Sequence, residues 1–139
     1  MTVEENKALL RRYGEEVFGK GNVALSDEFL SPDYVHHDPG VPPGREGRIQ
    51  MAEMHRTAWS DLDYRIEDLV AEGDKVALRW SCSGTHTGEW MGIPPTGKRV
   101  TWSGIGVHRI VDGKMVESWD VVDMLGLMQQ LGIVPPPGQ

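Results

Sequence analysis

The sequence predicts an α+β fold, in which a cone-shaped, curved antiparallel sheet wraps around three N-terminal helices and leaves a pocket between helices and sheet. Helix-forming segments come first, within residues 1–59, and strand-forming segments follow. This order is typical of the α+β class. The chain has 139 residues, the size of one domain with a single core. We therefore expect one domain over 1–139, with 134–139 as a loose tail because its consecutive prolines cannot continue a helix.

Three helices are expected in the first part of the chain. Thr2 followed three residues later by Glu5 is the pattern of a capping box, which begins a helix. Apolar residues then recur at helical spacing until two glycines end this first helix. A short second helix is expected over 23–30. A third is expected over 46–59, where His55 lies on a broad apolar stripe as a core or pocket-wall residue.

The remaining segments are predicted to be strands and loops. Three prolines and two glycines indicate a loop over 38–44, and the sequence EWMGIPPTG indicates another over 89–97. Runs rich in apolar residues between turn-forming sequences are typical of strands. We expect strands over 33–37, 64–71, 75–87, 98–111 and 115–123, and a short terminal helix over 124–131.

The charge balance and the hydropathy exclude several classes of partner. Lys and Arg number 14 against 21 Asp and Glu, which gives a formal net charge of -7. A nucleic-acid backbone or an anionic membrane surface would be repelled on average. No apolar run approaches the ~20 residues of a membrane span, and the first residues lack the pattern of a secretory signal. We therefore expect a cytoplasmic protein that binds neither nucleic acid nor membrane.

No metal site is expected. Cys82 is the only cysteine, which excludes an internal disulfide and a cysteine-rich metal site and agrees with a reducing compartment. Metal motifs also show short-range spacing between their ligands. The residues that could act as ligands are scattered instead, and they are His36, His86, His108 and Asp120.

Tryptophan and methionine are abundant for so small a chain, with five and seven residues. Broad flat rings and adaptable thioethers are typical of a pocket for a flat, mostly apolar ligand. Ordinary core packing is the alternative for many of them. Trp90 and Met91 are the best pocket candidates because they lie in a loop, and Trp102 is a further one.

The hairpin around Asp112 and Gly113 decides whether His108 and Asp120 share a face of the sheet. A tight two-residue turn would pair Val111 with the residue after Gly113. His108 and Asp120 would then point to opposite faces of the sheet. A three-residue loop over 111–113, with Gly113 left-handed, would shift the register by one residue. One face would then carry Gly104, Gly106, His108, Val116, Ser118 and Asp120.

Four segments carry a resemblance to a known family. They are SPDYVHHDP near the start, GTHTGEWMGIPPTGKRV and HRIVDGKMVESWD in the strands, and DMLGLMQQLG near the end. Together they resemble the SnoaL-like polyketide cyclases, ester cyclases of the nuclear transport factor two-like superfamily. The resemblance implies the same cone-shaped fold and an intramolecular aldol condensation that closes the last ring of an aromatic polyketide, without metal or cofactor.

The resemblance also implies the site residues. The family's base, an aspartate on the last strand, lines up with Asp120, and its helper histidine lines up with Gly106. We choose the shifted register, because the family places histidine and aspartate in one pocket, and we expect His108 to replace that histidine. An asparagine of the family lines up with His36. The expected substrate-binding residues are His36, His86, Trp90, Met91, Trp102, Gly104, Gly106 and Ser118, the two glycines leaving room for the ligand.

We expect burial beside Trp119 to raise the pKa of Asp120 and make it a useful base. Asp120 as a purely structural aspartate is the alternative. A non-catalytic small-molecule carrier and an epoxide hydrolase are the alternative functions. The last needs an Arg between two pocket aspartates, and the sequence identifies none.

We also expect a homodimer. In the chosen register the outer sheet face carries four apolar side chains, an area of apolar surface that monomers rarely expose. They are Ile105, Val107, Trp119 and Val121. Arg79 alternates with core residues and is expected to pair with a carboxylate at the subunit interface.

Overall fold

A computed structural model describes residues 1–38 and 41–135; the end of the expected tail, 136–139, lies outside them. The described helices are α1 (Val3–Tyr13), α2 (Ser26–Phe29), α3 (Arg45–Ala58) and α4 (Met124–Leu131). The described strands are β1 (Leu30–His36), β2 (Asp63–Glu72), β3 (Lys75–Thr85), β4 (Arg99–Val111) and β5 (Lys114–Val122). The helices and strands predicted from sequence are confirmed, with boundaries displaced by a few residues.

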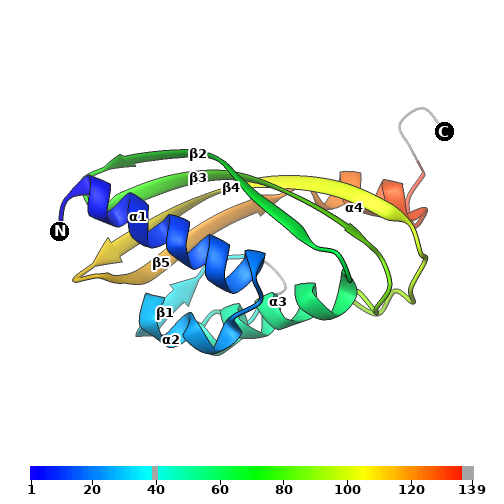
Figure 1. The fold of residues 1–139 in the computed structure, drawn as a ribbon, viewed down its shortest axis with the longest axis horizontal. Coiled ribbons are helices and arrows are strands. Elements are labelled where there is room, and N and C mark those ends of the chain that lie inside the picture. Colours follow the sequence, from blue (N-terminus) through cyan, green and yellow to red (C-terminus); the bar gives the residue numbers. More distant parts are fainter. Residues whose placement is uncertain (39–40, 136–139) are drawn as a thin grey trace.

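The strands form one sheet in the order β1-β5-β4-β3-β2. In Figure 1, β2, β3 and β4 arch over the top, α2 and α3 lie below them, and β1 lies low beside α2. The pairs among β2, β3, β4 and β5 are antiparallel, as expected. Strand β1 pairs parallel with β5, so the sheet is mixed rather than wholly antiparallel. At this edge position β1 tolerates Pro32, which cannot donate to a strand ladder.

The first helix begins and ends for local reasons. The Thr2 hydroxyl accepts the Glu5 N–H at 3.1 Å, and the Thr2 N–H donates to the Glu5 carboxylate, so the capping box is present. Beyond Tyr13 the helix widens into a π-helical segment, Gly14–Gly19. A Cβ at Gly14 would lie 2.8 Å from the Tyr64 ring, so the missing side chain lets this segment approach β2.

The β4–β5 hairpin reaches the expected face by a different route. Its turn is the tight two-residue one, with positive φ at both Asp112 and Gly113, and Val111 pairs with Lys114. A β-bulge then shifts the register, because Ile110 pairs with Met115 while the next pair on β4 skips one residue of β5. The three-residue loop was therefore wrong, although the shared face it predicted is present.

The core consists of two clusters of buried residues under the sheet. One lies between α1 and the sheet and includes Leu10, Tyr13, Val17, Leu30 and Met115. The other is rich in tryptophan and includes Trp59, Trp90, Trp102, Leu127 and Leu131. Trp80 packs against both clusters.

Candidate active site

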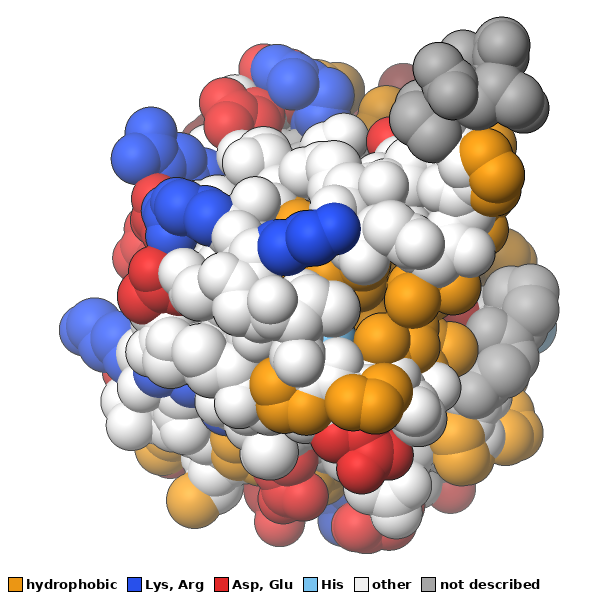
Figure 2. Space-filling model, turned by 90° about the vertical axis from the view of Figure 1, so that its right-hand side faces the viewer, with side chains coloured by type: hydrophobic (Ala, Val, Ile, Leu, Met, Phe, Trp, Pro, Cys, Tyr) orange, Lys and Arg blue, Asp and Glu red, His pale blue; other side chains and the backbone are white. Residues whose placement is uncertain are grey.

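A cavity of about 450 Å³ opens between the helices and the inner face of the sheet. Figure 2 shows apolar side chains gathered around a hollow in this face of the molecule. Three tryptophans line the cavity, and four methionines add adaptable walls. These residues are Trp80, Trp90, Trp102, Met51, Met54, Met91 and Met124. The predicted pocket residues Trp90, Met91 and Trp102 therefore do line a cavity.

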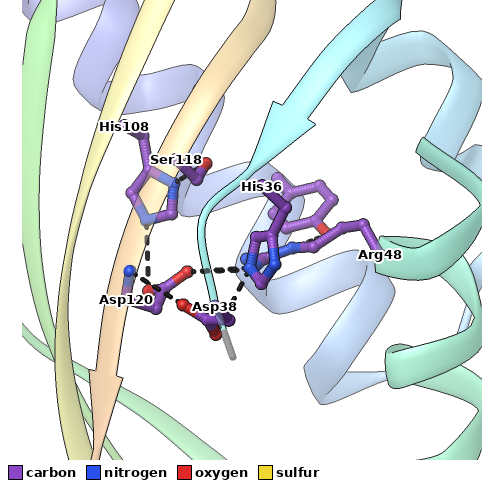
Figure 3. A network of polar contacts seen from close by, with 7 residues as sticks. His36, Asp38, Arg48, His108, Ser118 and Asp120 are labelled. Atoms are coloured by element: carbon purple, nitrogen blue, oxygen red, sulfur yellow. Dashed lines mark hydrogen bonds and ion pairs between the residues drawn. The ribbon is translucent and has the colours of Figure 1, made fainter. Parts of the chain in front are cut away.

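The charged residues among those described as lining the cavity are Asp38, Arg48 and Asp120. They come from the end of β1, from α3 and from β5. Figure 3 shows the two carboxylates side by side, with His36 beside them and His108 above Asp120. An otherwise apolar cavity thus carries one compact polar cluster.

Asp120 is held by three groups. Its Oδ2 accepts a hydrogen bond from Arg48 Nη1 at 3.0 Å and lies 3.4 Å from His36 Nε2. Its Oδ1 faces His108 Nε2 at 3.9 Å. Burial raises the pKa of Asp120, but the positive charge of Arg48 outweighs it, and the pKa lies well below its ordinary value. The expected rise was wrong because Arg48 was not foreseen.

Arg48 is buried, with a side chain only 7% exposed. Its Nε donates to the Tyr13 hydroxyl at 3.0 Å, and its guanidinium lies over the rings of Tyr13 and Phe18. Burial lowers the pKa of Arg48, but nearby Tyr13, Tyr34 and Asp120 raise it well above its ordinary value. The sequence identified no arginine between two pocket aspartates, and the structure places Arg48 in the cavity wall with Asp38 and Asp120.

His108 and Ser118 lie behind Asp120, and neither lines the cavity. The two residues are opposite each other on β4 and β5 and fully buried, with His108 Nδ1 2.7 Å from the Ser118 hydroxyl. Burial lowers the pKa of His108 to about 4, so the ring is neutral near pH 7. The space beside the glycines is already filled. A Cβ at Gly106 would overlap the Asp120 carboxylate, and one at Gly104 would lie 2.5 Å from Trp80.

Two histidines lie apart from the cluster. His86 is fully buried, packs on Trp59 and contacts the Thr96 hydroxyl at 3.0 Å, so it anchors the 89–97 loop and does not line the cavity. His55 does line it, accepting a hydrogen bond from Trp59 Nε1 at 3.3 Å, which agrees with the predicted pocket-wall role. Burial lowers the pKa of His55 to about 4.

Ligand atoms of His36, Asp38 and Asp120 lie within 4.8 Å of one another, which is the spacing of a metal site. Arg48 Nη1, however, is 3.0 Å from both His36 Nε2 and Asp120 Oδ2. The guanidinium therefore supplies positive charge where a metal ion would bind, and it disfavours one.

Sequence and structure comparisons agree on the class. The family model for SnoaL-like polyketide cyclases matches residues 8–131. Nogalonic acid methyl ester cyclase of Streptomyces nogalater is 31% identical over 83% of this chain and 89% of its own. Aklanonic acid methyl ester cyclase DnrD of Streptomyces peucetius is 33% identical over 76% of this chain and 72% of its own. Among solved structures, TsrD from Streptomyces laurentii has a TM-score of 0.88 at 32% identity, covering 96% of this chain and 99% of TsrD.

The fold and cavity are thus those of a SnoaL-like α+β domain. The chain belongs to the SnoaL-like polyketide cyclase family, and it is an enzyme of the polyketide cyclase type. Among the described residues, no helix is long and apolar enough to cross a membrane.

Proposed function

We propose that the protein closes a ring of a polyketide ester by an intramolecular aldol reaction, with Asp120 as general base and without metal or cofactor. The observation that carries the proposal is the ionised carboxylate of Asp120 in the wall of a cavity lined by aromatic rings. The relatives named for nogalonic and aklanonic acid methyl esters support the substrate class. A flat aromatic acid ester matches the tryptophan walls.

Arg48 limits the carbon acids that Asp120 can deprotonate. A carboxylate whose pKa is held low is a weak base, so it removes most readily a proton that two neighbouring carbonyl groups have made acidic. Arg48 also lines the cavity, where a guanidinium stabilises the enolate oxygen that forms. Low basicity thus favours an activated ester substrate over a simple ketone.

His108 acts on Asp120 rather than on the substrate. It lies outside the cavity lining. We assign its neutral ring the tautomer in which Nδ1 accepts from the Ser118 hydroxyl and the N–H is at Nε2, 3.9 Å from Asp120 Oδ1. His108 is therefore a positioning residue. Trp90, Met91 and Trp102 are proposed to bind the flat substrate.

Epoxide hydrolysis is a second candidate, because Asp38, Arg48 and Asp120 together line one cavity. Arg48 contacts Asp120 directly, whereas Asp38 joins the cluster through His36 and the Asp120 backbone. Two carboxylates so placed are able to hold a water for attack on an epoxide. Turnover of a small cyclic epoxide and of the methyl esters, measured on the same preparation, separates the two reactions. A carrier without catalysis would turn over neither.

The test of the main proposal is Asp120→Asn, which keeps the shape and removes the base. We expect at least ~100-fold loss of kcat on aklanonic or nogalonic acid methyl ester. Activity should be unaffected by prior chelation with EDTA. Asp68→Asn is a matched control, because it changes an exposed carboxylate that pairs with Arg79. An Asp120→Asn protein that melts and turns over like the parent would remove Asp120 from the mechanism.

We also propose that two copies associate through the outer face of β4 and β5. Ile105 is 54% and Val121 77% exposed there, and Trp119 is partly exposed beside them. Arg79 Nε donates to Asp68 Oδ2 of its own chain at 2.6 Å. The carboxylate partner of Arg79 is therefore found within the chain, and not across a subunit interface as expected.

A further inference from the structure

Asp38 is a second carboxyl group in the cavity wall that the mechanism above does not use. Its Oδ1 accepts the backbone N–H of Asp120 at 3.1 Å, and its Oδ2 lies 3.4 Å from His36 Nε2. Its side chain is 11% exposed, against 7% for Asp120. Asp38 is thus fixed beside the proposed base and faces the same cavity.

The hydrogen-bond donors and acceptors of the cluster indicate that one contact, between Asp38 and His36, lacks a hydrogen. Arg48 can only donate, so His36 Nε2, 3.0 Å from Arg48 Nη1, must be the acceptor and carries no hydrogen. The Oδ2 atoms of Asp38 and Asp120 lie 3.4 Å from that same nitrogen. With both carboxylates ionised, Arg48 would supply hydrogens to Asp120 Oδ2 and His36 Nε2, but Asp38 Oδ2 would face the His36 Nε2 lone pair with no hydrogen between them.

Charge balance leads to the same result. Two buried carboxylates against one guanidinium leave a net negative charge, and one added proton makes the cluster neutral. Arg48 holds Asp120 ionised, so the added proton belongs on Asp38. Burial and the neighbouring Asp120 carboxylate both raise the pKa of Asp38, although the Asp120 backbone N–H and Arg48 oppose them, in agreement with this assignment. Environments that separate two carboxyl groups in this way are typical of an acid paired with a base.

We propose that Asp38 is a second catalytic residue, the general acid that protonates the oxygen formed when the ring closes. The inference rests on the proposed aldol reaction. Asp120 takes the proton from the activated carbon, and that electron pair forms the new bond to the ring-closing carbonyl carbon. The carbonyl π pair moves onto its oxygen, which takes the proton from the Asp38 carboxyl.

A proton must then return from Asp120 to Asp38 before the next cycle. After ring closure Asp120 carries the proton and Asp38 is ionised. His36 Nε2 lies 3.4 Å from the Oδ2 of each, so a short transfer through this nitrogen returns the proton to Asp38. No proton is gained or lost over the cycle, and His36 becomes the relay between acid and base.

The experiment separates proton removal from proton donation. Ring opening of 5-nitrobenzisoxazole needs a base only, because its N–O bond breaks to release a stable phenolate, whereas ester cyclisation needs an acid as well. Asp38→Asn should open the benzisoxazole at close to the parent rate and lose ~100-fold or more in cyclisation of aklanonic acid methyl ester. Asp120→Asn should lose both activities. Asp38→Asn losing neither activity, or both equally, would overturn the acid role.

A second measurement needs no substrate. Carboxyl carbon NMR of protein labelled at aspartate should show one buried carboxyl protonated in the resting state, and Asp38→Asn should remove that signal. In Asp120→Asn the pKa of Asp38 should fall, because the neighbouring negative charge is gone while Arg48 remains. Both carboxyls ionised at pH 6, or the proton on His36, would refute the assignment. A protonated Asp38 in a protein that cyclises neither ester would instead count against the proposed reaction alone.

Discussion

Strand β5 carries buried polar side chains on its inner face and exposed apolar side chains on its outer face. Inside, Ser118 is fully buried and Asp120 is paired with Arg48. Outside, Trp119 stacks on His37 with ring centroids 5.1 Å apart, and Val121 is mostly exposed. This is the reverse of the usual arrangement, in which a strand presents apolar residues to the core and polar residues to water.

The difference shows that polarity alone does not locate the core in this part of the chain. The inner face of β5 is polar because, in our proposal, Asp120 is the reactive group in the cavity wall, and Arg48 from α3 balances its charge. The outer face is apolar because, in our proposal, a second copy covers it. The comparison predicts that disturbing the inner face affects the fold strongly, whereas disturbing the outer face affects only assembly.

The largest effect is expected for Arg48→Met on the inner side. The substitution keeps most of the volume and removes the cation, so Asp120 is left buried without its main partner. Losing one partner of a buried ion pair costs about 3–5 kcal/mol in the free energy of unfolding. Urea unfolding followed by tryptophan fluorescence measures this cost.

The double variant Arg48→Met with Asp120→Asn is the control. If the unpaired charge causes the loss, the double variant should recover part of the free energy of unfolding, because no buried charge then lacks a partner. A double variant that is no more stable than Arg48→Met would show that Arg48 acts through its packing on Tyr13 and Phe18 instead.

Much of this inner face could be predicted from the sequence. Period-two alternation and the Asp112-Gly113 turn located the hairpin. The family resemblance then chose the register in which His108 and Asp120 share a face, and the strand pairing confirms that shared face. The bulge that produces this parity has no sequence signal of its own; a tight turn alone would have inverted the face. The sequence analysis explained the shared face by a three-residue loop. The structure instead has a two-residue turn followed by a bulge.

Two of the residues around Asp120 could not be predicted, because they are distant in the sequence and the resemblance identified neither. Arg48 lies 72 residues away and Asp38 82 residues away, and neither spacing indicates contact. One signal was available for Arg48. It falls on the apolar stripe of α3 with Ala52 and His55, at intervals of four and three residues, where an isolated arginine indicates a buried charge that needs a partner.

A smaller change in the free energy of unfolding is expected when the pH is lowered, because His108 on the inner face is buried. Because burial lowers the pKa of His108 to about 4, against ~6.5 in an unfolded chain, only the unfolded state binds this proton between those values. Stability should therefore fall as the pH drops from ~6.5 towards 4, by up to ~1.4 kcal/mol per pH unit. Urea unfolding of parent and His108→Gln at several pH values measures the difference.

The His108→Gln protein should have a shallower pH dependence than the parent over that range. His55 also has a lowered pKa and contributes a dependence of the same sign, so part of the slope should remain. His37→Gln, on the outer face, should leave the His108 contribution in place. Equal slopes in the parent and in His108→Gln would mean that His108 is not held neutral by burial.

The smallest effect on the fold is expected on the outer face. Val121→Lys places a charge in the proposed contact between copies, on a side chain that is already 77% exposed. Exposed substitutions of this kind change the free energy of unfolding by roughly 0.5 kcal/mol or less.

Assembly should nevertheless respond, because a lysine on each copy would be buried without a partner. Sedimentation at micromolar concentration should show the parent as a dimer and Val121→Lys near the 15.5 kDa of one chain. Val3→Lys, at an exposed valine of α1 on the other side of the sheet, should remain dimeric. If the parent itself sediments as a single chain, the apolar outer face is not a dimer interface, and the reversed polarity of β5 needs a different explanation.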